Sequence, residues 1–95
     1  MDKNQKGWQH FIALCKNTPD DKMLFSLLDL FLTAEEHDHL ATRYLIVKEL
    51  ISGKKTQRQI AKDLNVSIAK ITRGSNELKR VNNQIVHYLQ KEFKK

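Results

Sequence analysis

The sequence predicts an all-α protein of about six short helices. Apolar residues recur at spacings of three and four along most of its 95 residues, and no alternating apolar–polar run indicates a strand. Two capping boxes, at Thr33 and Thr56, mark helix starts within the chain. One proline, three glycines and no low-complexity stretch leave little room for linkers, so we expect one domain over residues 1–95.

The first two predicted helices differ in how their apolar residues are distributed. The first has one apolar face, made of Trp8, Phe11, Ile12 and Cys15. Thr18 is predicted to cap the second helix, with Pro19 at its first position. From Met23 to Leu32 the second helix is apolar on nearly all sides, and such a helix must be buried on all sides. Since so short a chain can hardly surround it, we expect an intertwined homodimer.

The remaining helices are bounded by recognisable caps. Thr33 and Glu36 form the capping box of a third helix, which Gly53 ends. Its predicted inner stripe is Leu40, Tyr44, Val47 and Ile51. A last amphipathic helix is predicted from the spacing of Val81, Ile85, Leu89 and Phe93.

Residues 56–73 carry the pattern of a helix-turn-helix. Two short helices that cross steeply need a small residue at the crossing, a turn residue that tolerates positive φ, an apolar plug, a cap, and a branched apolar residue on the second helix. The sequence supplies these in order as Ala61, Asn65, Val66, Ser67 and Ile71. In this motif the second helix, here called the reading helix, enters the major groove of DNA.

The positive charge is concentrated in the same segment. Residues 54–80 hold eight Lys/Arg against two Asp/Glu, whereas residues 1–53 hold six against eight. Such asymmetry is typical of a surface that contacts phosphates. A solvated basic face is the alternative explanation.

The reading helix offers the residues closest to base edges. Small and apolar side chains contact thymine methyls, and lysine donates to guanine O6 or N7. The candidates at its cap and in its first turns are Ser67, Ile68, Ala69, Lys70 and Thr72. Arg58 is expected to reach a base or a phosphate. The other cations, assigned to phosphates, are Lys54, Lys55, Lys62, Lys79 and Arg80.

Other classes of function find little support. No Ser/His/Asp, Cys/His or paired-carboxylate pattern indicates an enzyme, so we expect no catalytic residues. The four histidines lack the spacing of a metal site. A single cysteine, Cys15, excludes an internal disulfide. No signal peptide or membrane-spanning run is present, so we expect a cytoplasmic protein without a membrane partner.

The string Ile71-Thr72-Arg73-Gly74-Ser75-Asn76 directly after this motif resembles the bacterial tryptophan operon repressor family. The resemblance extends without gaps from Trp8 to Lys79, about three quarters of the chain. It includes Leu32-Thr33, Thr42-Arg43, Ile46-Val47, Glu49-Leu50 and Gln57-Arg58. This family is itself a reference example of helix-turn-helix docking on DNA.

The resemblance implies a homodimer with L-tryptophan as corepressor and no other cofactor. Arg43 and Arg73 match the arginines that flank the indole, an arrangement that suits planar cations. Arg73 would also bind the ligand carboxylate, and Gly74 would let the ring approach the backbone. Leu30, Leu32 and Thr33 match positions whose carbonyls the partner subunit offers to the ligand ammonium. Ligand binding would shift the reading helices to the spacing of successive major grooves, without catalysis.

Three positions depart from the family pattern. Glu77 stands where a small residue is usual, near the ligand amino group, and would either pair with the ammonium or point to solvent. Lys70 replaces a small polar residue on the reading helix, and Ala61 replaces a common basic one. Two alternatives therefore stay open: a regulator that needs no ligand, or one that responds to another amino acid or an indole derivative.

Overall fold

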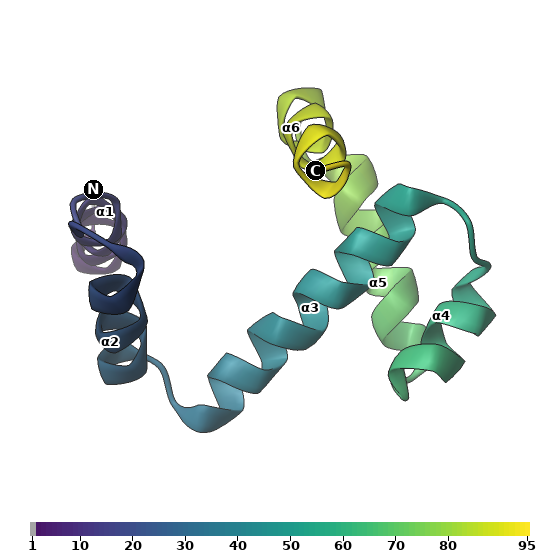
Figure 1. Ribbon diagram of the computed structural model, residues 1–95, viewed down its shortest axis with the longest axis horizontal. Coiled ribbons are helices and arrows are strands. Elements are labelled where there is room, and N and C mark those ends of the chain that lie inside the picture. The colour runs from purple at the N-terminus through teal and green to yellow at the C-terminus, as the bar shows by residue number, and fades with distance from the viewer. Residues whose placement is uncertain (1) are drawn as a thin grey trace. The chain divides into compact units, whose positions relative to one another are not determined.

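The structure, a computed structural model, describes residues 2–95 as six α-helices without a strand (Figure 1). The helices are α1 (Lys3–Lys16), α2 (Asp21–Phe31), α3 (Ala34–Ser52), α4 (Gln57–Leu64), α5 (Ile68–Arg80) and α6 (Asn83–Phe93). The predicted all-α class and the number of helices are thus confirmed for these residues. The helices form two compact units, one running to His37 and the other from Asp38 to Lys95.

The first unit contains α1 and α2. An edge contact between Phe11 and Phe31, with ring centroids 5.3 Å apart, joins the two helices. The predicted cap of α2 is wrong: Asp20, not Thr18, is its N-cap and accepts from the Met23 amide at 2.8 Å. Thr18 instead donates its hydroxyl to the Cys15 carbonyl at 2.9 Å. The short connection must satisfy both helix ends, and a hydroxyl satisfies an orphan carbonyl that a carboxylate cannot.

The second unit is built on a small core between α3, α4 and α5. Its buried residues are Ile46, Ile60, Ala61 and Ile71, with Leu50, Leu64 and Val66 packed around them. The predicted inner stripe of α3 misses Ile46, which is the buried residue of this helix, whereas Leu40 and Tyr44 of the stripe are about half exposed in the single chain. The reason is that α5 crosses α3 on the side of Ile46 and Leu50, which the periodicity of α3 alone does not define.

The helix-turn-helix forms as the sequence predicts. Thr56 and Gln59 make the capping box of α4, and Ser67 caps α5. Among residues 2–95, α4 and α5 make the most extensive contact between two helices, and they lie side by side in Figure 1. Ala61, only 6% exposed, occupies the crossing, and Ile71 on α5 is fully buried. The α4–α5 pair is therefore held together by residues that the pattern singled out.

Asn65 supplies the turn between α4 and α5. Its φ of 55° and ψ of 49° place it in the left-handed region, which favours Asn or Gly. We predict that Asn65→Ala lowers the free energy of unfolding by about 1 kcal/mol, measured by urea denaturation, because alanine gains strain there. Asn65→Gly, the control, should stay within about 0.5 kcal/mol of the parent protein. Equal losses for both would show that the Asn side chain, and not the backbone conformation, stabilises the turn.

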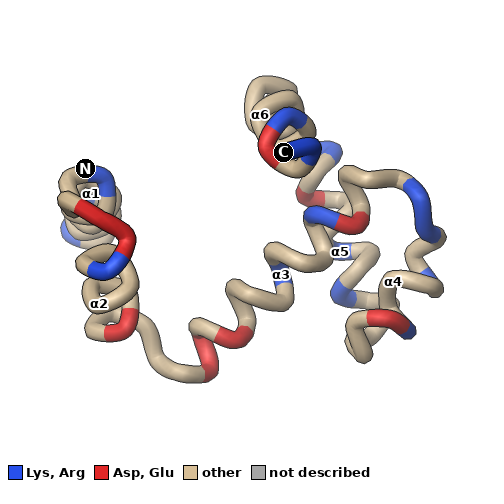
Figure 2. Tube along the Cα trace, viewed as in Figure 1, with Lys and Arg blue, Asp and Glu red and all other residues tan. Residues whose placement is uncertain are grey.

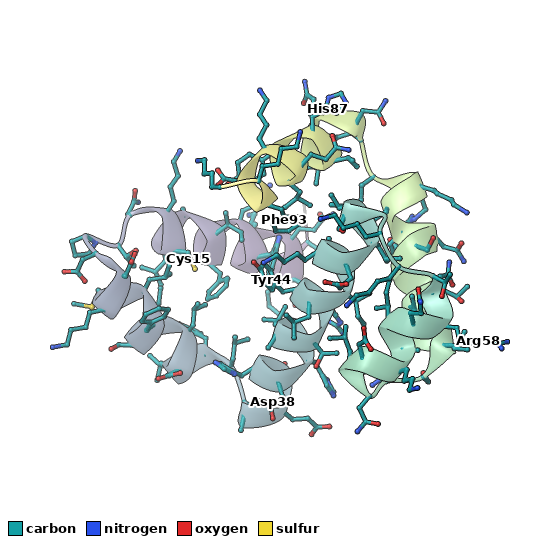
Figure 3. All side chains as sticks on the ribbon, turned by 45° about the vertical axis from the view of Figure 1, so that its right-hand side comes forward. Cys15, Asp38, Tyr44, Arg58, His87 and Phe93 are labelled. Carbon is teal, nitrogen blue, oxygen red and sulfur yellow. The ribbon has the colours of Figure 1, made fainter. Side chains whose placement is uncertain are left out.

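The last helix begins later than its apolar spacing suggests. Val81, predicted on that helix, is the extended C-cap of α5, and Asn82 caps α6 by accepting from the Ile85 amide at 3.0 Å. α6 returns to α3 at its other end, where Phe93 meets Tyr44 edge-on with centroids 5.7 Å apart (Figure 3). This return places the apolar face of α6 opposite α3 and α5.

Candidate nucleic-acid interface and ligand pocket

The N-terminal half of α5 presents an exposed face. Ser67, Ile68, Ala69, Lys70 and Thr72 are all exposed, whereas Ile71 between them is buried against α4. The structure thus brings the predicted base-edge candidates together at the start of one helix, whose free amides also favour phosphate. Arg58 is exposed on α4 and projects outward in Figure 3.

Thr72 is held by a residue of the other helix. Its hydroxyl donates to the Gln57 side-chain carbonyl at 3.0 Å, which links the reading helix to the first turn of α4. This contact has no signal in the sequence, because the two residues lie 15 positions apart. The bond adds a polar contact at the exposed edge of the α4–α5 pair.

The cations of residues 54–80 differ in how they are paired. Figure 2 shows them along the α3–α4 connection, α4 and α5. Lys55, predicted to contact phosphate, lies 2.8 Å from Asp63 and 3.1 Å from Glu49. Hydrogen bonds to these two carboxylates raise the pKa of the Lys55 ammonium. These carboxylates balance the charge of Lys55. Because Glu49 lies on α3 and Asp63 on α4, the two ion pairs connect these helices.

Lys79 is exposed near the end of α5. We predict that Lys79→Ala weakens binding to all DNA sequences and reduces the slope of log K against log salt by about 1, as expected for one lost phosphate contact. Lys91→Ala on α6 removes the same charge elsewhere and serves as the control. A loss confined to one base position, in mobility shifts across operator variants, would instead show that Lys79 contacts a base.

A pocket of about 540 Å³ lies beside the reading helix. This volume falls in the range of about 300–1,000 Å³ usual for small-molecule sites. Its apolar wall comes from α3, α5, α6 and the α5–α6 connection, as Ile46, Val47, Leu78, Val81, Ile85 and Leu89. Its polar residues are His39, Thr42, Arg43, Lys70, Arg73 and Glu77. The pocket thus combines a broad apolar surface with charges of both signs.

The structure brings together four of the seven predicted ligand residues. Arg43 on α3 lines the same pocket as Arg73, Gly74 and Glu77 on α5, although 30 residues separate the two arginines. The other three, Leu30, Leu32 and Thr33, belong to the unit that ends at His37 and do not line this pocket. Their assignment to the ligand site of a partner subunit stays a prediction.

Gly74 has a packing role that its sequence motif did not reveal. A Cβ atom at this position would lie 3.1 Å from Ile46 Cγ2 and 3.4 Å from Leu50 Cδ1. The missing side chain therefore lets α5 lie close against α3. Gly74 also lines the pocket, so one residue sets the distance between the two helices that carry Arg43 and Arg73.

Glu77 lines the pocket, and its side chain is 54% exposed. Its Oε2 accepts from Arg80 Nη2 at 2.8 Å, one turn further along α5. This carboxylate raises the pKa of the Arg80 guanidinium through its hydrogen bond and its charge. Arg80, predicted to contact phosphate, is thus paired in this structure.

Several residues of the pocket were missed by sequence reasoning. The sequence pattern placed His39, Ile85 and Leu89 on helices but did not predict that they line a pocket. Lys70 also lines the pocket, although it was predicted only to contact DNA. Among residues 2–95, no group of three or more His, Cys, Asp or Glu side chains is arranged to hold a metal ion. Over the same range, every helix is too short or too polar to cross a membrane.

The fold and the exposed basic face define a helix-turn-helix DNA-binding protein. The sequence model of the family described as "Trp repressor protein" matches residues 6–93. The chain is 48% identical over 93 residues to a "Trp operon repressor homolog" of Chlamydia trachomatis serovar D, covering 96% of this chain and 99% of that protein. A homolog of the same description from Vibrio vulnificus strain YJ016 is 46% identical over 72 residues, covering 76% of this chain and 71% of that protein.

A third such homolog, from Chlamydia caviae, is 39% identical over 89 residues and covers 94% of this chain and 88% of that protein. The chain therefore belongs to the Trp repressor family and is a transcriptional repressor of that family. The family resemblance predicted from the motif after the helix-turn-helix is confirmed.

Proposed function

We propose that this chain is an L-tryptophan-dependent repressor, which binds operator DNA of tryptophan biosynthesis or transport genes as a homodimer. The observation that carries the proposal is the pocket beside the reading helix. Its apolar wall suits an indole ring, and Arg43 and Arg73 offer planar cations to the ring and to a carboxylate. Because Arg73 and Lys70 belong to the reading helix itself, a bound ligand would bias its position.

Exposed apolar side chains support the homodimer. Phe25 is 66% exposed and Leu30 77% exposed, although both lie on a helix that is apolar nearly all round. Trp8 on α1 is 64% exposed. So much exposed apolar surface is unusual for a monomer and typical of an interface. A second copy of the chain would bury these residues and bring Leu30, Leu32 and Thr33 to the ligand site of its partner.

For DNA recognition, the proposal uses the exposed face of the motif. Ile68, Ala69 and Lys70 would approach base edges, with Thr72 and Ser67 beside them and Arg58 and Lys79 against the backbone. The two reading helices of a dimer would then enter successive major grooves, about 34 Å apart.

The test combines calorimetric titration with L-tryptophan and a mobility shift on a trp operator with and without the ligand. Saturable binding at one site per chain, with operator binding only in its presence, would support corepression. Operator binding without ligand would keep the helix-turn-helix and discard the pocket as an effector site. Saturable binding of another amino acid or an indole derivative, but not of L-tryptophan, would reassign the effector.

A further inference from the structure

The ligand pocket has an unusual charge pattern. Among the described residues that line it, three are permanently or usually cationic, namely Arg43, Lys70 and Arg73. Glu77 is the one carboxylate in that lining. A zwitterion needs both signs, because its carboxylate seeks cations and its ammonium seeks an acceptor. Glu77 is therefore the charged group of this wall that suits the ammonium of an amino acid.

The Glu77 carboxylate is already engaged, but by a partner outside the pocket. Arg80 does not line the pocket, and its guanidinium reaches Glu77 from the next turn of α5. The two side chains are 54% and 78% exposed. Ion pairs exposed to this degree are weak and exchange readily. A ligand ammonium that enters the pocket can therefore compete with Arg80 for the same carboxylate.

We propose that Glu77 recognises the ligand's ammonium group by exchanging its ion pair with Arg80 for one with the ligand. This inference rests on the proposed function and specifies how its ligand is selected. Amino acids bind with the exchange, whereas analogues that lack the amino group leave Glu77 paired with Arg80. The pocket thus distinguishes an amino acid from a deaminated acid with the same ring and carboxylate.

The exchange also changes the charge that α5 presents to DNA. With Arg80 paired to Glu77, the two charges cancel at the end of the reading helix, next to Lys79. Once the ammonium neutralises Glu77, Arg80 is an uncompensated cation and becomes available to a phosphate. Ligand binding therefore makes one further phosphate contact per chain available.

The test compares L-tryptophan with 3-(indol-3-yl)propionate, which lacks only the amino group. Binding is measured by calorimetry for the parent protein, Glu77→Gln and Glu92→Gln. Glu92 forms an i,i+3 ion pair with Lys95 at 3.3 Å and is absent from the pocket wall, so its variant is a matched control. Glu77→Gln should weaken L-tryptophan about three- to tenfold and change the propionate less than about twofold. Glu92→Gln should change neither.

Salt dependence tests the release of Arg80. Slopes of log K against log salt are measured on non-operator DNA, where binding depends on phosphate contacts and does not require the operator complex. With L-tryptophan bound, Arg80→Gln should reduce the slope by about 0.9 per chain, and without ligand it should leave the slope unchanged. Equal reductions in both states would overturn the release. Equal effects of Glu77→Gln on the two ligands, or none on either, would overturn ammonium recognition and with it the release of Arg80, but not the proposed function. Failure of the parent protein to bind L-tryptophan would overturn the proposed function as well.

Discussion

Arg73→Ala is expected to abolish the stimulation of DNA binding by L-tryptophan. Arg73 lines the pocket and belongs to the reading helix, so it connects ligand and DNA-binding element directly. Its guanidinium can stack on an indole ring and bind a carboxylate with two hydrogen bonds. Removing charge-assisted contacts of this kind costs about 1.5–3 kcal/mol, or roughly a 10- to 150-fold loss of ligand affinity.

The measurement is calorimetric titration with L-tryptophan, followed by mobility shifts of the same variant. Arg58→Ala is the control, because Arg58 is exposed on α4 and is not part of the pocket wall. It should weaken DNA binding and leave ligand affinity unchanged. Sedimentation should show the same oligomeric state for both variants. A normal response of Arg73→Ala to L-tryptophan would refute the assignment of the pocket.

Ile60→Ala should cause the largest loss of stability among the substitutions considered. Ile60 is 0% exposed and belongs to a core that has four buried members among residues 2–95. Truncation of a buried isoleucine to alanine removes apolar burial and leaves a cavity, which costs about 2–5 kcal/mol. In a protein of this size that loss corresponds to a decrease in Tm of at least about 8 °C. Small domains are only marginally stable, so such a change reduces the folded fraction appreciably.

Thermal and urea denaturation at one fixed protein concentration measure this effect, because dimerisation would make stability depend on concentration. Ile60→Val should lose about 0.5–1.5 kcal/mol. Ile68→Ala provides the exposed counterpart, since Ile68 is 46% exposed, and should change stability by about 0.5 kcal/mol or less. Similar losses for Ile60→Ala and Ile68→Ala would mean that the α4–α5 contact does not determine the stability of this unit.

The helix caps and the turn of the helix-turn-helix were predicted most accurately from the sequence. The capping boxes at Thr33 and Thr56 are formed, with the hydroxyl of each residue 3.1 Å from the amide three positions later. Asn65 takes the left-handed conformation and Ser67 caps the reading helix. These features depend on residues within a few positions of one another, so the sequence contains all the groups involved. The errors at Thr18 and Val81 concern helix ends: Asp20 caps α2, and Val81 ends α5 before Asn82 caps α6.

By itself, the sequence determined the helices, the helix-turn-helix, the basic segment and the family, because each depends on neighbours along the chain or on a contiguous motif. Only the tertiary structure decided which face of α3 is buried, how Gly74 lets α5 approach it, and that Lys70 lines the same pocket as Arg43. It also decided that Lys55 joins α3 to α4 and that Arg80 pairs with Glu77. The periodicity of a helix allows more than one of its faces to be buried, and each side chain has several rotamers. The helices that pack against it, which are distant in the sequence, decide which face is buried and which rotamers are adopted.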